Sequence, residues 1–178
     1  THLGPLELKA VRGYLSKQGY ESTGTPGCYN PSTRQWTAGV LIVWKGGMYE
    51  GGTGREHLAG RVVSVGLKAQ DGSAFELVGA YMPVRSSDSA TITEAWNIAE
   101  GLVLGAGHVV LAGDLNAELK AAIQRARRAG RERIETLADR RLQDFVDGDA
   151  NMVALPASKR TYRDKSEIDH WLAGEGVA

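Results

Sequence analysis

The chain has 178 residues, 42% of them hydrophobic and 24% charged, and its formal net charge at pH 7 is zero. This length allows one domain with a sizeable core, and the balanced charge gives no sign of a nucleic-acid or membrane partner. The single cysteine, Cys28, excludes an internal disulfide and a cysteine-ligated zinc cluster. No apolar run approaches the length of a membrane span, so no membrane partner is expected.

The first third of the chain predicts one helix, one long loop and one strand. Residues 5–20 carry a helical apolar stripe, and Gly19 is placed to end that helix. Residues 21–36 are rich in Gly, Ser, Thr and Pro and are predicted to be a loop, whereas residues 39–44 are predicted to be a strand. The sequence Gly51-Gly52-Thr53-Gly54 looks like a phosphate-binding loop, but neither a helix pattern nor Lys-Ser/Thr follows it. A flexible turn is therefore predicted.

A hairpin and a helix follow. Residues 61–68 and 75–84 are predicted strands, and the Asp71-Gly72 pair between them is a strong hairpin signal. Residues 91–104 predict an amphipathic helix, with Thr91 or Thr93 as the N-cap.

The last third of the chain is rich in arginine. Residues 118–145 have a helical pattern that is interrupted near Gly130. A basic helix could lie along a phosphate backbone, but Glu118 and Asp139 are among the interleaved acids, and this favours a solvated helix face. Residues 152–155 form a short apolar run, and residues 166–172 predict a last strand. Since hairpins join the strands, we expect an α/β domain in which helices cover a mixed or antiparallel sheet.

The stretch most informative about function is Gly113-Asp114-Leu115-Asn116, which follows the apolar run 109–112. That run predicts a strand buried on both faces. In an extended backbone Asp114 and Asn116, two residues apart, would point the same way. The carboxylate could accept a proton or bind a metal, and the amide could orient a water or a phosphate oxygen. The alternative is a turn in which both side chains satisfy local backbone groups.

Three motifs occur in order: Tyr81-x-Pro83, Gly113-Asp114-Leu115-Asn116 and Ser166-x-Ile168-Asp169-His170. This set resembles the endonuclease/exonuclease/phosphatase superfamily, which includes apurinic endonucleases, DNase I-like enzymes and inositol-phosphate phosphatases. The resemblance implies a four-layer α/β sandwich of two facing mixed or antiparallel sheets flanked by helices, with the active site at one rim. Residues 1–178 would be a single, partial domain of this kind.

A narrower resemblance rests on Thr1-His2-Leu3, Ala38-Gly39-Val40 and the Ser166–His170 motif, which are similar to segments of LINE-type retrotransposon endonucleases. It implies metal-dependent phosphodiester hydrolysis with DNA as the partner, and a reverse-transcriptase region in the parent protein. A phosphatase or lipid phosphodiesterase of the same fold is the first alternative. A non-catalytic relic domain is the second.

The resemblance also implies roles for four residues. Asp114 would position and deprotonate the attacking water and contribute to binding Mg²⁺ or Mn²⁺. Asn116 would hold the nucleophile or a phosphate oxygen, and the phenol of Tyr81 would donate a hydrogen bond to the phosphate. Asp169 would orient a catalytic histidine, whereas His170 is expected to be structural. From the residues alone, the preferred interpretation of Tyr81 is a strand aromatic that fills the core.

The resemblance has two gaps. The metal-binding Glu that precedes Thr-His-Leu in the family and its terminal Ser-Asp-His segment are both absent from these 178 residues. If the alignment holds, the chain begins just past that Glu. We therefore expect a domain cut at both ends that does not hydrolyse phosphodiesters by itself.

Overall fold

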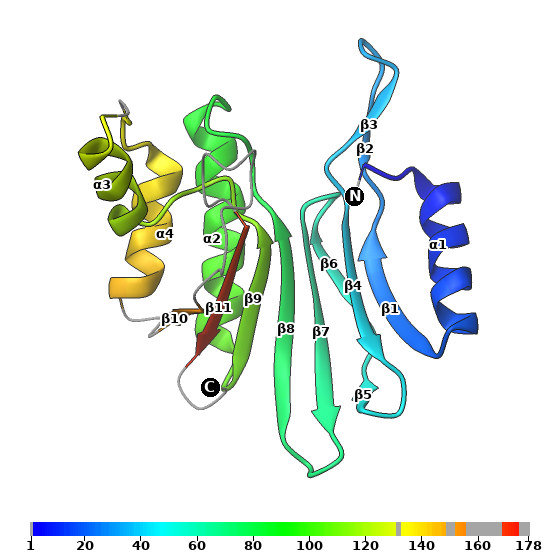
Figure 1. Cartoon of the computed structure of the whole chain (residues 1–178). Helices are drawn as coiled ribbons and strands as arrows, with labels where there is room; N and C mark the ends of the chain where they lie inside the picture. Colours follow the sequence, from blue (N-terminus) through cyan, green and yellow to red (C-terminus); the bar gives the residue numbers. More distant parts are fainter. Residues whose placement is uncertain (1, 131–132, 149–151, 156–168, 175–178) are drawn as a thin grey trace.

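The structure, a computed structural model, describes residues 2–130, 133–148, 152–155 and 169–174. It has four layers in the order helix, sheet, sheet, helices (Figure 1). The outer helix α1 (Pro5–Lys17) covers the small sheet, in which β1 (Tyr20–Thr25) pairs with β4 (Val40–Lys45). The predicted four-layer α/β sandwich is therefore confirmed.

The large sheet is mixed. Its main path is β10 (Met152–Leu155), β11 (Asp169–Gly174), β9 (Val109–Asp114), β8 (Ala74–Tyr81), β7 (Val62–Ala69) and β5 (Tyr49–Gly51), and β6 (Arg55–Leu58) also pairs with β7. The pair β8–β9 is parallel, and the other pairs of this sheet are antiparallel. The outer helices on this side are α2 (Ser89–Gly105), α3 (Lys120–Arg128) and α4 (Leu137–Asp147). None of the described helices is long and apolar enough to cross a membrane.

The prediction of a loop over residues 21–36 was wrong. This stretch contains most of β1, together with β2 (Cys28–Asn30) and the start of the β3 strand (Gln35–Thr37), which pairs with β2. The whole of β1 pairs with β4, and a Cβ on Gly24 would collide with the backbone of Val40. Long-range pairing with an apolar strand overrides the weak strand propensity of a Gly-, Ser- and Thr-rich segment.

The two cores lie on opposite faces of the large sheet. Between the sheets, Val40 and Ile42 of β4 pack against Val63 and Val65 of β7. Gly79 of β8 lets β4 pack this closely on the large sheet, because a Cβ at position 79 would lie only 2.8 Å from Val40. The other core is larger and fills the space between the large sheet, α2 and α4. There the fully buried Trp96 packs edge-on against Phe145, with 5.3 Å between the ring centroids.

The N-cap prediction for the second helix was also wrong. The cap is Asp88, and its carboxylate accepts hydrogen bonds from the backbone nitrogen and the hydroxyl of Thr91, at 2.9 and 2.7 Å. A carboxylate is a stronger acceptor than a hydroxyl and favours the positive end of a helix, so α2 begins at Ser89.

The arginine-rich segment forms two helices, α3 and α4, separated near Gly130 as predicted. Thr136 caps α4 through a capping box with Asp139. The interpretation of all the interleaved acids as solvated was wrong for Glu118 and Asp139, which are both buried. Of the predicted last strand, residues 166–168 lie outside the described part of the chain, and β11 begins at Asp169.

Strand β9 differs from its prediction in burial. Val109 and Leu111 are buried, but Val110 and Ala112 are only half-buried. The inner face of β9 opens onto a groove of about 540 Å³, which residues 39–43 and Trp171 also line. This groove separates the end of β9 from the small sheet and leads to the polar residues described next.

Candidate functional site

Three of the four predicted site residues lie in one row across the large sheet. Tyr81 ends β8, Asp114 ends β9 and Asp169 begins β11. Asp114 pairs with Tyr81 on one side and with Asp169 on the other. Neighbouring strands are about 4.8 Å apart, so these three backbones are adjacent although the residues are far apart in sequence. Tyr81 and Asp114 both line the inter-sheet groove.

The fourth residue, Asn116, lies in a tight turn after β9. Gly113 has φ +142°, and a Cβ there would collide with the carbonyl oxygen of Ala80, so glycine is needed where β9 meets β8. The carboxylate of Asp114 accepts a hydrogen bond from the backbone nitrogen of Asn116 at 3.0 Å. Asn116 adopts φ +48° and donates from its side-chain amide to the carbonyl oxygen of Met82 at 2.8 Å.

The argument that Asp114 and Asn116 share a direction because the backbone is extended was therefore wrong. The chain turns instead. The carboxylate of Asp114 holds a local backbone group, as in the alternative of a structural turn, whereas the amide of Asn116 reaches the carbonyl oxygen of Met82, far away in the sequence. The turn nevertheless keeps both residues at the end of β9, where the Asp114 carboxylate binds the backbone nitrogen of Asn116.

Tyr81 lies between a cation and an imidazole. The guanidinium carbon of Arg61 is 5.9 Å from the centroid of the tyrosine ring, and the His2 ring lies edge-on at 5.9 Å on the same ring. Arg61 also donates to the carbonyl oxygen of Tyr81 at 3.2 Å. Burial and the nearby carboxylate of Asp114 raise the pKa of Tyr81, and Arg61 partly opposes them. The phenol is thus a protonated hydrogen-bond donor at neutral pH.

Sequence reasoning missed both neighbours of Tyr81. Arg61 could have been found from the predicted hairpin, since the register that pairs Val62 with Ala80 places Arg61 opposite Tyr81. The sequence does not place His2 beside Tyr81, because that position depends on a long-range hydrogen bond from the backbone nitrogen of His2 to the carbonyl oxygen of Ala38, at 2.6 Å.

A network of buried charged side chains contacts the turn through the backbone oxygen of Asn116. Arg85 donates from Nε to the backbone oxygen of Asn116 at 3.1 Å, and its Nη2 lies 3.0 Å from Asp139 and 3.5 Å from Glu118. Arg133 donates to Glu118 at 2.6 Å. Two arginines thus balance two buried carboxylates directly beneath the turn.

His170 occupies the structural position expected for it. Its ring is buried, and Nε2 lies 2.8 Å from the carbonyl oxygen of Ala117. This contact ties β11 to the residue after Asn116, so His170 fixes the turn from the side opposite Met82.

The residues at this edge supply only part of a metal site. Asp114 and Asn116 carry the oxygen donors that Mg²⁺ and Mn²⁺ prefer. However, the described ranges contain no group of three or more His, Cys, Asp or Glu side chains that could hold a metal. We therefore derive no chemical step through a metal from these residues.

Comparison with solved structures identifies the fold. A 3′ phosphatase from Neisseria, solved with a product DNA hairpin, matches 98% of this chain and 73% of its own, with TM-score 0.65 and 15% identity. An endonuclease/exonuclease/phosphatase from Beutenbergia cavernae matches 94% of this chain and 50% of its own, with TM-score 0.56 and 13% identity. The chain has the endonuclease/exonuclease/phosphatase fold.

A third protein of this fold, the 2′,3′-cyclic phosphatase ANGEL2, matches 98% of this chain and 68% of its own, with TM-score 0.58 and 10% identity. No family model matches the sequence, and no curated protein matches it. The superfamily resemblance inferred from three short motifs thus agrees with the endonuclease/exonuclease/phosphatase fold. The closer likeness to LINE-type endonucleases stays a prediction.

Proposed function

We propose that this protein hydrolyses phosphate esters of nucleic acid, with Asp114 at the centre of the active site. The observation that carries the proposal is the row formed by Tyr81, Asp114 and Asp169, which lies beside the turn at Asn116 and at the mouth of the inter-sheet groove. Two proteins of similar fold are named as phosphatases, and one of them was solved with DNA. They support a phosphate ester as the substrate.

The proposed mechanism relies on positioning. Asp114 orients a water molecule and accepts its proton, and the hydrogen bond from the backbone nitrogen of Asn116 holds this carboxylate in one orientation. Tyr81 donates a hydrogen bond from its phenol to a phosphate oxygen, and Arg61 places positive charge beside that phenol. Asn116 binds the nucleophile or a second phosphate oxygen. Asp169 orients the imidazole of the catalytic histidine that the family's terminal Ser-Asp-His segment supplies. No covalent intermediate is needed.

Mg²⁺, or Mn²⁺ in its place, belongs to the proposal as the cofactor. Magnesium in phosphate-processing sites is often held by one or two carboxylates together with substrate phosphates, and Asp114 would be the ligand from this edge. When bound, such an ion would polarise the phosphate and neutralise developing charge.

The finer proposal is a DNA endonuclease of a retroelement, with a reverse-transcriptase region in the parent protein. It rests on the similarity of residues 1–3, 38–40 and 166–170 to LINE-type endonucleases. The competing activity is a nucleic-acid phosphatase, because two of the similar structures are named as phosphatases. The inactivity of the isolated 178 residues stays a prediction.

The test uses the 178-residue chain and the parent protein in parallel. Nicking of supercoiled plasmid and release of phosphate from a 3′-phosphorylated oligonucleotide are measured with and without Mg²⁺. We expect Asp114→Asn to lower the turnover of the parent protein by about 100-fold or more. Asp144→Asn, which changes an exposed carboxylate on α4, should leave turnover unchanged.

The two substrates separate the two activities. Nicking without phosphate release supports the endonuclease, and the reverse supports the phosphatase. A parent protein that processes neither substrate, or one whose turnover does not depend on Asp114, refutes the proposed function. Turnover by the isolated chain contradicts the expected inactivity alone.

A further inference from the structure

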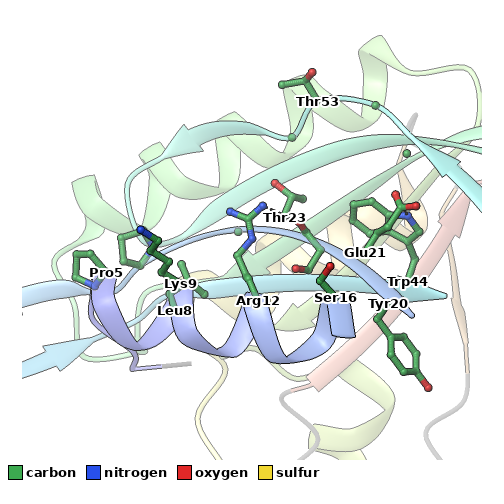
Figure 2. Close-up of a pocket in the computed structure, with 17 residues that line it drawn as sticks. Pro5, Leu8, Lys9, Arg12, Ser16, Tyr20, Glu21, Thr23, Trp44 and Thr53 are labelled. Atoms are coloured by element: carbon green, nitrogen blue, oxygen red, sulfur yellow. Dashed lines mark hydrogen bonds between the residues drawn. The ribbon is translucent and has the colours of Figure 1, made fainter. Parts of the chain in front are cut away.

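A second cavity lies on the outer side of the small sheet, away from Asp114. Its volume is about 760 Å³, and α1, β1 and the loop of residues 51–54 surround it. Figure 2 shows side chains from α1 and β1 reaching into it, with Thr53 on the opposite wall. It shares no lining residue with the groove at Asp114. The proposed catalytic function therefore makes no use of this cavity.

The wall formed by residues 51–54 is made of backbone that packing holds in place. A Cβ on Gly51 would collide with the indole of Trp44, and a Cβ on Gly54 would collide with Thr23. The backbone nitrogen of Gly52 donates to the carbonyl oxygen of Gly66 at 2.9 Å. The prediction of a flexible turn was wrong, because Gly51 ends β5 and residues 52–54 form a short connection to β6 that these contacts anchor. The cavity therefore has a preformed wall.

The opposite wall carries positive charge. Lys9, Arg12 and Ser16 lie three and four residues apart on α1 and so share one side of the helix, facing the cavity. Arg12 donates from Nη2 to the backbone oxygen of Ser22 at 2.9 Å, which holds its guanidinium over β1 (Figure 2). A guanidinium has five N–H donors, so most of them remain available for a ligand.

Among the described residues that line the cavity, Glu21 is the one carboxylate, and it lies at the other end. Glu21 accepts a hydrogen bond from Nε1 of Trp44 at 3.1 Å, and Figure 2 shows these two side chains together, away from Lys9. Lys9 has no ion-pair partner within the described residues. The end of the cavity near Lys9 and Arg12 is therefore the part with an excess of positive charge.

We propose that this cavity binds a phosphate ester about the size of a mononucleotide. Lys9 and Arg12 would bind the phosphate, because a guanidinium and an ammonium are the side-chain groups best suited to this anion. The hydroxyl groups of Ser16 and Thr23 line the same space and can donate to it. The volume lies within the range of ligand pockets, and Leu8 is among the apolar residues that line it and would contact the body of the ligand.

Two probes test this site on the isotope-labelled 178-residue chain: inorganic phosphate and deoxyadenosine monophosphate. Both should give saturable amide shifts in α1, in β1 and in residues 51–54, and the mononucleotide should bind more tightly because it also contacts the apolar lining. Lys9→Gln and Arg12→Gln should each weaken binding by about tenfold. The side chain of Lys9 makes no hydrogen bond within the described residues, so Lys9→Gln is the variant expected to leave the fold undisturbed.

Two further variants test whether the effect is specific. Lys17→Gln removes the same charge from the same helix outside the cavity lining and should leave binding unchanged. Glu21→Gln should tighten binding, because it removes the negative charge while the glutamine oxygen can still accept from Trp44.

Three results would overturn the inference: no saturable shift at the cavity, shifts confined to residues 113–118, or equal weakening by Lys17→Gln. Asp114→Asn should leave binding at the cavity unchanged. Failure of the proposed catalytic function and failure of this site can therefore be told apart.

Discussion

Arg85 should be essential to the stability of the turn that carries Asp114 and Asn116. Its side chain is 20% exposed and contacts Glu118 and Asp139, whose side chains are 4% and 0% exposed. Arg85→Met keeps most of the apolar stem but leaves two buried carboxylates for which Arg133, bound to Glu118, is the remaining arginine among the described residues. Removing one partner from a buried charge network costs about 3 kcal/mol or more in the free energy of unfolding.

For a chain of this size, that loss corresponds to a melting temperature lower by about 6–12 °C. Urea unfolding followed by tryptophan fluorescence measures the loss in the free energy of unfolding. Trp96 of α2 is a suitable probe because it is fully buried in the core that α2 shares with α4. The matched control is Arg141→Met. Arg141 pairs with Glu100 at 3.6 Å, and the glutamate side chain is 42% exposed, so this pair should contribute less than about 1 kcal/mol.

A double variant tests the cause of the loss. If the charge left behind is responsible, Arg85→Met combined with Glu118→Gln should be more stable than the sum of the two single changes predicts, by about 1 kcal/mol. The reasoning is refuted if Arg85→Met costs no more than Arg141→Met, or if the effects of Arg85→Met and Glu118→Gln simply add.

Three other changes have defined outcomes. Gly113→Ala should lower the free energy of unfolding by about 3 kcal/mol, because alanine is strained at φ +142° and its Cβ would meet the backbone of β8; thermal melting measures the loss. Burial, and then the carboxylate of Asp114, raise the pKa of Tyr81 above its ordinary value of 10.0, so the associated stability is complete below that pH and is lost as pH rises through the folded-state pKa. Tyr81→Phe should therefore reduce the alkaline fall in the urea midpoint, and an unchanged pH profile would contradict this. Thr136→Ala removes the N-cap hydroxyl of α4 and should lower the free energy of unfolding, measured in urea, by about 1 kcal/mol, whereas Thr136→Ser should cost little.

The sequence was most informative where the determining contacts are local. Asp71-Gly72 predicts the β7–β8 hairpin because a tight turn needs such residues, whatever the rest of the chain does, and Gly72 adopts φ +88° there. The apolar spacing of residues 91–104 predicts a helix for the same reason, although the cap at Asp88 was missed. Glycine at position 113 and the polar residues after it likewise identified the end of β9 as the place to look for chemistry.

Local patterns failed where a distant partner decides. The pairing of β1 with β4 turned an apparent loop into a strand, and the proximity of Arg85 turned the apparently solvated Glu118 and Asp139 into buried ions. Burial of a charge depends on its counter-charge, and nothing in the local spacing of an acid reveals that partner.

The sequence by itself therefore determined the helices, the β7–β8 hairpin, the α/β class and three of the positions that meet at the end of β9. Only the tertiary structure placed Tyr81, Asp114 and Asp169 in one row, added Arg61 beside the tyrosine and replaced an extended Asp-x-Asn segment by a turn. The physical reason is that backbone propensity acts over a few residues, whereas a site is made by strand register and charge pairing between segments far apart in the chain.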